Sequence, residues 1–300
     1  MTVAPEQFDP AADSGACPEW RSLPGEFFTS DEIYRTDTDR VWRRGWLFAG
    51  HDCEIPSAGD YFTFNLGTDP LIVIRGEDGV VREFDNVCRH RDTSGSARQL
   101  VCPYHQWVYG KDGKLLSYRG MHQELDSDSL GLLPVATENL CGFIIVNLDD
   151  RPVDFGPARE QLELMLKPQG VDRAKVARAV NYTVRANWKL VWENNRDCYH
   201  CNLTPLQYIK ANYDHFNTDS SSPKMTACID EKAEEGRDYD LEKLMPFWQL
   251  TSEHDWELCE AAQLGVQFSG YRPGPYSKYK EYNVKRFVSW YLNQLAKFNK

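Results

Sequence analysis

Two short segments of this chain each carry one cysteine and one histidine at spacings that suit a metal cluster. Cys88 and His90 form a C-x-H pair, and after eleven intervening residues Cys102 and His105 form a C-x-x-H pair. Each pair offers one thiolate and one imidazole. This is the ligand set of a [2Fe–2S] cluster in which two cysteines bind one iron and two histidines bind the other. The pattern therefore predicts one-electron transfer at a raised reduction potential.

Two other interpretations of the same residues compete with the cluster. Structural zinc also uses mixed cysteine and histidine ligands, but zinc fingers usually pair like ligands, as C-x-x-C followed by H-x₃₋₅-H. The nine cysteines of the chain could also be buried, reduced thiols, as is common in proteins that are not exported. Because each segment alternates Cys with His, a cluster of the Rieske type is favoured over both.

A second set of candidate ligands lies in the C-terminal half. Asp197 and His200 form a D-x-x-H pair, and residues at i and i+3 of a helix share one face. Asp255 places another carboxylate on a second expected helix. A histidine and a carboxylate are two thirds of the 2-His-1-carboxylate site that binds non-haem Fe(II) and leaves positions open for O₂. Alone, such a pair is more often a hydrogen-bonded pair or a solvated face, and the cluster motif upstream raises its weight.

Length and composition limit the classes of protein that fit. A chain of 300 residues allows about two domains. The net charge of −11 disfavours binding to nucleic acid, which needs basic surfaces, and to anionic membranes. No apolar run approaches the ~20 residues that cross a bilayer, and the N-terminal residues resemble no export signal. We expect a cytoplasmic protein with reduced thiols.

The segment around the cluster motif is rich in strand patterns. β-branched and aromatic runs at 61–66, 71–74, 80–84 and 142–148 lie between turn residues. Asp112-Gly113 between two further apolar runs is typical of a hairpin turn. We therefore expect a small antiparallel β domain over residues 45–150, with both ligand loops at its tips, where a rigid sheet can present a cluster to a partner.

The flanking regions predict helices and a mixed second domain. Residues 1–44 read as a lead-in followed by a helix, with Thr29 and Glu32 as a capping box and an end near Arg44. After a linker at 151–157, the pattern predicts a strand at 177–184 and helices at 188–202, at 252–264 with Gly265 as its stop, and at 283–296. The expected fold is α+β, with domains at 1–44, 45–150 and 151–300.

Several stretches together resemble one known family. They are Cys88-Arg89-His90-Arg91, Cys102-Pro103-Tyr104-His105-Gln106-Trp107, Asn187-Trp188-Lys189-Leu190, Asp197-Cys198-Tyr199-His200 and Glu253-His254-Asp255-Trp256. The chain resembles the α subunit of a Rieske non-haem iron oxygenase over nearly its whole length. Within the family it is most similar to the branch that oxidises quaternary ammonium compounds, such as the glycine betaine and stachydrine demethylating oxygenases.

The resemblance implies cofactors and roles. The [2Fe–2S] Rieske cluster would be bound by Cys88 and Cys102 on one iron and by His90 and His105 on the other. The resemblance also implies mononuclear Fe(II) in a catalytic domain with a helix-grip-like sheet, which this chain has in a shortened form. The matching iron ligands are His200 and Asp255.

The resemblance also implies partners. Asp197 matches the carboxylate that bridges the cluster of one protomer to the mononuclear iron of its neighbour, so a homotrimer is expected. Electrons would come from a separate NAD(P)H-dependent reductase with flavin and iron–sulfur groups. The oxidised product would be a carbinolamine that releases formaldehyde.

The sequence departs from the family pattern in three places. The second histidine expected five residues after His200 is replaced by Pro205, which has no metal-binding side chain. His215 would lie about 22 Å along a continuous helix from His200, and His254 would point about 100° away from Asp255. The loop between His90 and Cys102 is shorter than usual by about four or five residues. The whole chain is shorter by roughly a quarter, with the shortfall near 220–224.

Three functions stay open at this stage. The leading one is an O₂-dependent monooxygenase that demethylates a small quaternary or tertiary amine, held by aromatic rings through cation–π contacts; the ring candidates are Tyr199, Phe247, Trp248 and Trp256. The second, motivated by Pro205, is a Rieske electron carrier or interaction subunit with a degraded iron site. The third is the α subunit of an aromatic-ring-hydroxylating oxygenase.

Overall fold

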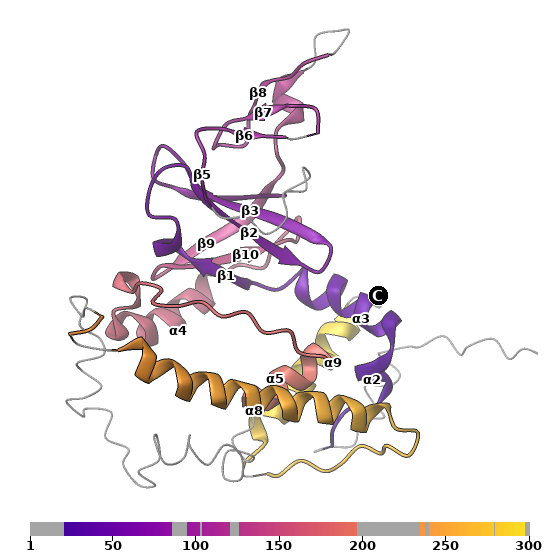
Figure 1. The fold of residues 1–300 in the computed structure, drawn as a ribbon. Helices are drawn as coiled ribbons and strands as arrows, with labels where there is room; N and C mark the ends of the chain where they lie inside the picture. Colours follow the sequence, from indigo (N-terminus) through magenta and orange to yellow (C-terminus); the bar gives the residue numbers. More distant parts are fainter. Residues whose placement is uncertain are drawn as a thin grey trace, which may run out of the picture. The chain divides into compact units, whose positions relative to one another are not determined.

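The computed structural model describes residues 21–85, 95–102, 104–120, 126–196, 235–237, 240–278 and 280–297. They fall into two compact units, shown as a ribbon in Figure 1. One unit, here called the β unit, is Trp42–Ala179. The other, the helical unit, combines the described residues of Met1–Val41 with those of Val180–Lys300. The N-terminal helix thus joins the C-terminal helices in one unit, and the expected boundary at 150 lies near 179 instead.

The β unit is built on one antiparallel seven-stranded sheet of order β1-β10-β9-β4-β3-β2-β5. Leu71 and Val73 of one strand and Ile144 and Val146 of another are buried on one face together with Ile55. The β-branched and aromatic runs that predicted these strands therefore supply apolar side chains to a core. The strands are β1 Leu47–His51, β2 Asp60–Leu66, β3 Asp69–Arg75, β4 Val81–Asp85, β5 Gly95–Ser96, β9 Pro134–Leu140 and β10 Phe143–Asn147.

A second, three-stranded sheet completes the β unit. It has the order β6-β7-β8, with β6 at Leu100–Val101, β7 at Val108–Tyr109 and β8 at Leu115–Ser117. The predicted hairpin turn at Asp112-Gly113 is confirmed. Gly113 has a φ of +82°, and a Cβ at this position would lie 2.5 Å from the Phe84 ring of the large sheet. Only glycine allows this backbone conformation and this close approach together.

Helix α4 and short 3₁₀ turns cover one end of the β unit. Helix α4 spans Gly156–Leu166, and Arg159 on it contacts Glu138 of β9. His51 accepts from Cys53 N–H at 3.2 Å and its Nε2 lies 3.0 Å from the carbonyl of Val171. These contacts keep the chain up to about residue 179 with the sheet. The 3₁₀ turns are Asp52–Glu54, Ser127–Leu130, Lys167–Gln169 and Val171–Arg173.

The helical unit packs its described helices around one apolar core. The core contains Phe27, Ile33, Leu190, Phe287 and Tyr291, among others. Helix α5 packs against both the long helix α8 and helix α9 (Figure 1). The helices are α2 Glu26–Thr29, α3 Asp31–Asp37, α5 Trp188–Arg196, α8 Leu241–Gln267 and α9 Tyr282–Lys297, and a π-helical turn at Thr38–Trp42 follows α3. In the described part of the chain, no helix is long and apolar enough to cross a membrane.

Three sequence predictions in this unit need correction. The N-cap of α3 is Ser30, whose hydroxyl accepts from Ile33 N–H, because Thr29 already ends α2 and donates to the carbonyl of Gly25. Helix α8 continues past Gly265 to Gln267, since the buried side chain of Val266 holds its last turn in the core. The predicted strand at 177–184 is absent; a strand needs a paired neighbour, and none of the described residues pairs with it.

Candidate metal centres

The segment from Cys102 to Trp107 forms a closed turn at the end of β6. The N–H of Cys102 donates to the carbonyl of Trp107 at 2.8 Å, and the N–H of Gln106 donates to the carbonyl of Cys102 at 2.8 Å. Gln106 has a φ of +60°, a left-handed conformation that reverses the chain. The turn therefore carries Cys102 and His105, the second predicted ligand pair, on one short loop.

The two ligands differ in their surroundings. Cys102 is 7% exposed and packs with Tyr109 and Leu115 in a small apolar cluster under the loop. His105 is exposed, and its ring meets that of Tyr104, which is itself 83% exposed, edge to face at 4.1 Å. A buried thiol and an accessible imidazole suit a cluster that is anchored on the inner side and meets a redox partner on the outer side. The residues present thus fit half of a Cys₂His₂ set.

The other predicted ligands of this pair of loops lie outside the described residues. Cys88 and His90 belong to the segment 86–94, between β4 and β5 in the sequence. Within the described ranges alone, no group of three or more His, Cys, Asp and Glu side chains is close enough to hold a metal ion. This is the expected result when two of the four predicted ligands fall outside those ranges.

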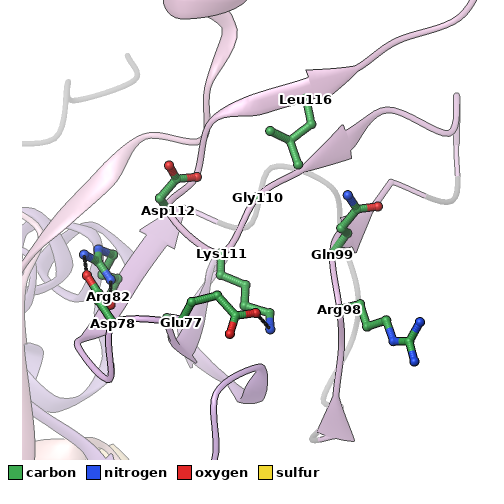
Figure 2. A pocket seen from close by; sticks show the side chains of 10 residues that line it. Glu77, Asp78, Arg82, Arg98, Gln99, Gly110, Lys111, Asp112 and Leu116 are labelled. Carbon is green, nitrogen blue, oxygen red and sulfur yellow. Dashed lines mark hydrogen bonds and ion pairs between the residues drawn. The ribbon is translucent and has the colours of Figure 1, made fainter.

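A pocket lined by charged side chains lies between the turn that joins β3 to β4 and the turn that joins β7 to β8 (Figure 2). Lys111 of the second turn, whose side chain is only 10% exposed, pairs with Glu77 of the first at 2.6 Å. Arg82 pairs with Asp78 at 2.5 Å and holds the pKa of that carboxyl well below its usual range. The Lys111–Glu77 ion pair joins the turn of the three-stranded sheet to a turn of the large sheet.

One buried acid in the β unit gave no signal in the sequence. Glu83 on β4 is 1% exposed, and neither of its carboxyl oxygens has a hydrogen-bond partner among the described residues. It stands opposite Val73 on one side and Val135 on the other. Burial raises the pKa of this carboxyl to about 8, so it is mainly protonated at neutral pH. A lone glutamate in a strand pattern reads as a solvated position, and only the strand pairing places it inside.

Helix α5, which runs toward the predicted iron ligands, is anchored by a buried ionic network. Asp37 of α3 accepts from Trp188 Nε1 at 2.9 Å, from Tyr291 Oη at 2.5 Å and from Lys189 Nζ. Both Asp37 and Lys189 are fully buried. Burial lowers the pKa of Lys189 against the opposing effect of Asp37. Asn187 caps the helix, its side-chain oxygen accepting from the N–H of Lys189 at 3.1 Å.

Asp255 lies on the face of α8 that meets α5. One turn further along α8, the thiol of Cys259 lies 3.9 Å from the carbonyl oxygen of Leu190 in α5. Burial, helped by the negative charge of Asp255, raises the pKa of that thiol to about 11. A half-buried carboxylate between two packed helices fits the role of one iron ligand. Asp197, His200, Pro205 and His215 all lie outside the described residues.

Helix α8 stays helical through His254 and Asp255. The two side chains therefore point about 100° apart, which disfavours His254 as a substitute ligand on the same ion. Its Nδ1 is shielded from solvent and has no hydrogen-bond partner in the described part of the structure.

The predicted substrate-binding rings are partly placed. Phe247 and Trp248 on α8 meet edge to face at 5.3 Å, and the Trp248 ring is half exposed. Trp256 contacts the ring of Tyr182 at 6.0 Å, and its indole N–H is buried without a hydrogen-bond partner among the described residues. Tyr199 lies outside them. The three described rings are thus spread along one helix and do not form a cage.

Two family models match the chain in order. Residues 45–140 match the Rieske [2Fe-2S] domain, and residues 171–226 and 218–297 match the ring hydroxylating alpha subunit (catalytic domain). The chain belongs to the Rieske non-haem iron oxygenase α subunits. The expected fold class and cofactor set, a Rieske cluster and a mononuclear iron, are those of this family. The Rieske match contains Cys102 and His105, the predicted ligand pair that lies in one closed turn.

Comparison with individual proteins agrees with this assignment. The glycine betaine monooxygenase oxygenase subunit of Chromohalobacter salexigens is 30% identical over 381 aligned positions, covering 91% of this chain and 86% of that protein. The carnitine monooxygenase oxygenase subunit of Escherichia coli K12 is 32% identical over 191 positions, covering 60% of this chain and 51% of that protein. The crystal structure of the quaternary ammonium Rieske monooxygenase CntA with L-carnitine superposes with a TM-score of 0.79 at 21% identity, covering 96% and 99% of the two chains.

Proposed function

We propose that this Rieske oxygenase demethylates a small quaternary ammonium compound, with glycine betaine as the leading candidate. The observation that carries the proposal is the similarity over nine tenths of the chain to a subunit named for glycine betaine. The closed turn that carries Cys102 and His105 supports it. The position of Asp255 on the face of α8 that packs against α5 also supports it. When bound, the cluster would supply single electrons and the mononuclear iron a site for O₂.

The residues of this chain would divide the work between the two units. In the β unit, the cluster would be held by Cys88, His90, Cys102 and His105. In the helical unit, His200 and Asp255 would hold the iron, and Asp197 would link it to the cluster of a neighbouring protomer. Trp248 and Trp256 offer indole faces to a cationic substrate, each contact contributing about 0.5–2 kcal/mol.

The proposal includes two kinds of partner. A separate NAD(P)H-dependent reductase with flavin and iron–sulfur groups would deliver electrons at the exposed side of the Cys102–Trp107 turn, where His105 is accessible. A homotrimer would bring the cluster of one protomer to the iron of the next.

A specific feature favours a second candidate function, a Rieske electron carrier with a degraded iron site. Pro205 stands where the family pattern has the second histidine. In addition, the alignment with the glycine betaine subunit extends over 381 positions although this chain has 300 residues. The relative therefore carries a long segment that this chain lacks. A chain with two of three iron ligands would bind iron weakly while its cluster still accepted electrons.

Iron content and turnover distinguish the two candidates. The purified chain would be reconstituted with Fe(II) and sulfide, and its iron content, the electron paramagnetic resonance of the reduced cluster and formaldehyde release from glycine betaine would be measured with a competent reductase. An oxygenase binds about three irons per chain and releases formaldehyde, whereas a carrier binds about two. A reduced cluster with three irons but no formaldehyde would refute glycine betaine demethylation.

Two substitutions test the assigned roles. Asp197→Asn should keep both metals bound but nearly abolish turnover, since the linking carboxylate is lost; unchanged turnover would show that the assignment is wrong. Pro205→His should raise the occupancy of the mononuclear iron. Unchanged occupancy would mean that the missing histidine is not what limits iron binding.

A further inference from the structure

The groove between α5 and α9 carries a cluster of side chains that the proposed oxygenase reaction does not use. It has a volume of about 410 Å³. Two of its lining residues come from α5 and four from α9: Trp192, Arg196, Asn283, Arg286, Phe287 and Trp290. None of them was singled out by the sequence, because two arginines and two tryptophans spaced along separate amphipathic helices read as ordinary surface positions.

The floor of this groove is a stack of aromatic rings. Trp192 stacks on Phe287 with centroids 3.9 Å apart and planes 23° apart. Phe287 is in turn nearly parallel to Trp290, at 6.0 Å and 29°. Phe287 is buried, but Trp290 is 45% exposed. An indole that is held by a stacked neighbour and still exposed is a ready platform for another flat ring.

The two guanidinium groups of the groove each lie over an aromatic ring. Arg196 lies over the ring of Trp192 at 5.3 Å, and Arg286 lies over the ring of Tyr282 at 5.7 Å. No ion pair joins either to an acid among the described residues, although the chain has an excess of acids and a net charge of −11. Among the described residues, the groove is therefore a local concentration of positive charge.

We propose that this groove binds a small planar aromatic anion, such as a one- or two-ring aromatic carboxylate. The ring would stack on Trp290, and the carboxylate would accept hydrogen bonds from Arg286 or Arg196, whose planar forks match carboxylate geometry. The volume is near the lower end of ordinary small-molecule sites. A quaternary ammonium ion would be repelled by both arginines. The ligand of this groove is therefore different from the substrate of the proposed demethylation.

The charge of the ligand is tested with a matched pair of probes on the full chain. 2-Naphthoate and its neutral analogue 2-naphthamide would be titrated calorimetrically at low and at physiological salt. We expect saturable binding of 2-naphthoate, weakened by salt, and at least about 10-fold weaker binding of the amide, because the charge-assisted hydrogen bonds are lost. Equal affinity for both probes, or no binding of 2-naphthoate up to about 5 mM, would overturn the proposal.

Variants locate the binding to the groove. Arg286→Gln and Trp290→Leu should each weaken 2-naphthoate at least about 10-fold, while Arg272→Gln, which removes an exposed arginine elsewhere in the same unit, should not. Circular dichroism checks that each variant is folded. If neither groove variant changes the affinity for 2-naphthoate, the ligand does not bind in this groove and the proposal fails. If Arg286→Gln instead lowers the molecular mass of the assembly measured by sedimentation, the groove is a contact between copies of the chain and the ligand proposal fails.

Discussion

Replacing Glu83 with leucine should change how the stability of the β unit depends on pH. The wild-type carboxyl is 1% exposed and has no hydrogen-bond partner in the part of the chain that the structure describes, and burial raises its pKa from the ordinary 4.5 to about 8. Below pH 4.5 both the folded and the unfolded chain hold the proton. Between pH 4.5 and 8 the unfolded chain releases it while the folded chain retains it, so the wild type loses stability as pH rises.

The pKa shift sets the size of the effect. Each pH unit in this window costs the wild type about 1.4 kcal/mol, and the whole window costs about 5 kcal/mol. Glu83→Leu removes the titrating group and fills the same apolar region with methyl groups. The stability advantage of the variant should therefore grow from pH 4.5 to pH 8 and then stay constant.

Urea unfolding followed by circular dichroism at several pH values from 4.5 to 9 measures this difference. Glu160→Gln, at an exposed position on α4 of the same unit, is the matched control and should show no growing difference. If wild type and Glu83→Leu have parallel pH profiles, Glu83 is not protonated in the folded state. The account of a buried, neutral carboxyl would then be refuted.

Three further predictions concern packing and the cluster loop. Asp37→Leu should destabilise the helical unit by about 3–5 kcal/mol because it leaves the buried charge of Lys189 unpaired; in urea unfolding, Asp37→Leu with Lys189→Met should cost less than the two single changes added. Gly113→Ala should lower the melting temperature well below that of Gly79→Ala, which shares a positive φ but has open space around its Cβ position, and equal losses would show that the steric contact does not matter. Cys102→Ser should abolish the visible absorption of the reconstituted cluster without changing helix content by circular dichroism, and a retained spectrum would remove Cys102 from the ligand set.

The local features of the β unit could be predicted from the sequence. Runs of β-branched and aromatic residues, together with Asp112-Gly113, located β2, β3, β4, β10 and the β7–β8 hairpin because these signals depend on neighbours a few residues apart. Strands β1 and β9 were not predicted. The same holds for Cys102 and His105, whose spacing already implies one short turn. Helices α5 and α9 were also predicted close to their observed starts, since each carries an apolar stripe with the helical period.

The ends of elements were less predictable. Ser30 and Thr29 are equally good caps by composition, and the choice depends on the short helix α2 that precedes them. Gly265 reads as a stop, yet packing of Val266 into the core carries α8 further. The strand expected at 177–184 has the right residue types but no partner among the described residues, and strand propensity without a partner does not form a sheet.

The sequence by itself determined the family and predicted the cluster ligands and the kinds of element that hold them, because these depend on residue type and short spacing. The tertiary structure alone decided which charged groups are buried and which remain unpaired. Glu83 is buried, and its pKa is raised, only in the folded sheet, where β4 lies between β3 and β9. Asp37 and Lys189 form their buried contact although they are 152 positions apart in the sequence. Arg196 and Arg286 became a common site only when α5 packed against α9. Charge states and binding grooves depend on distances between segments far apart in the chain, which folding sets.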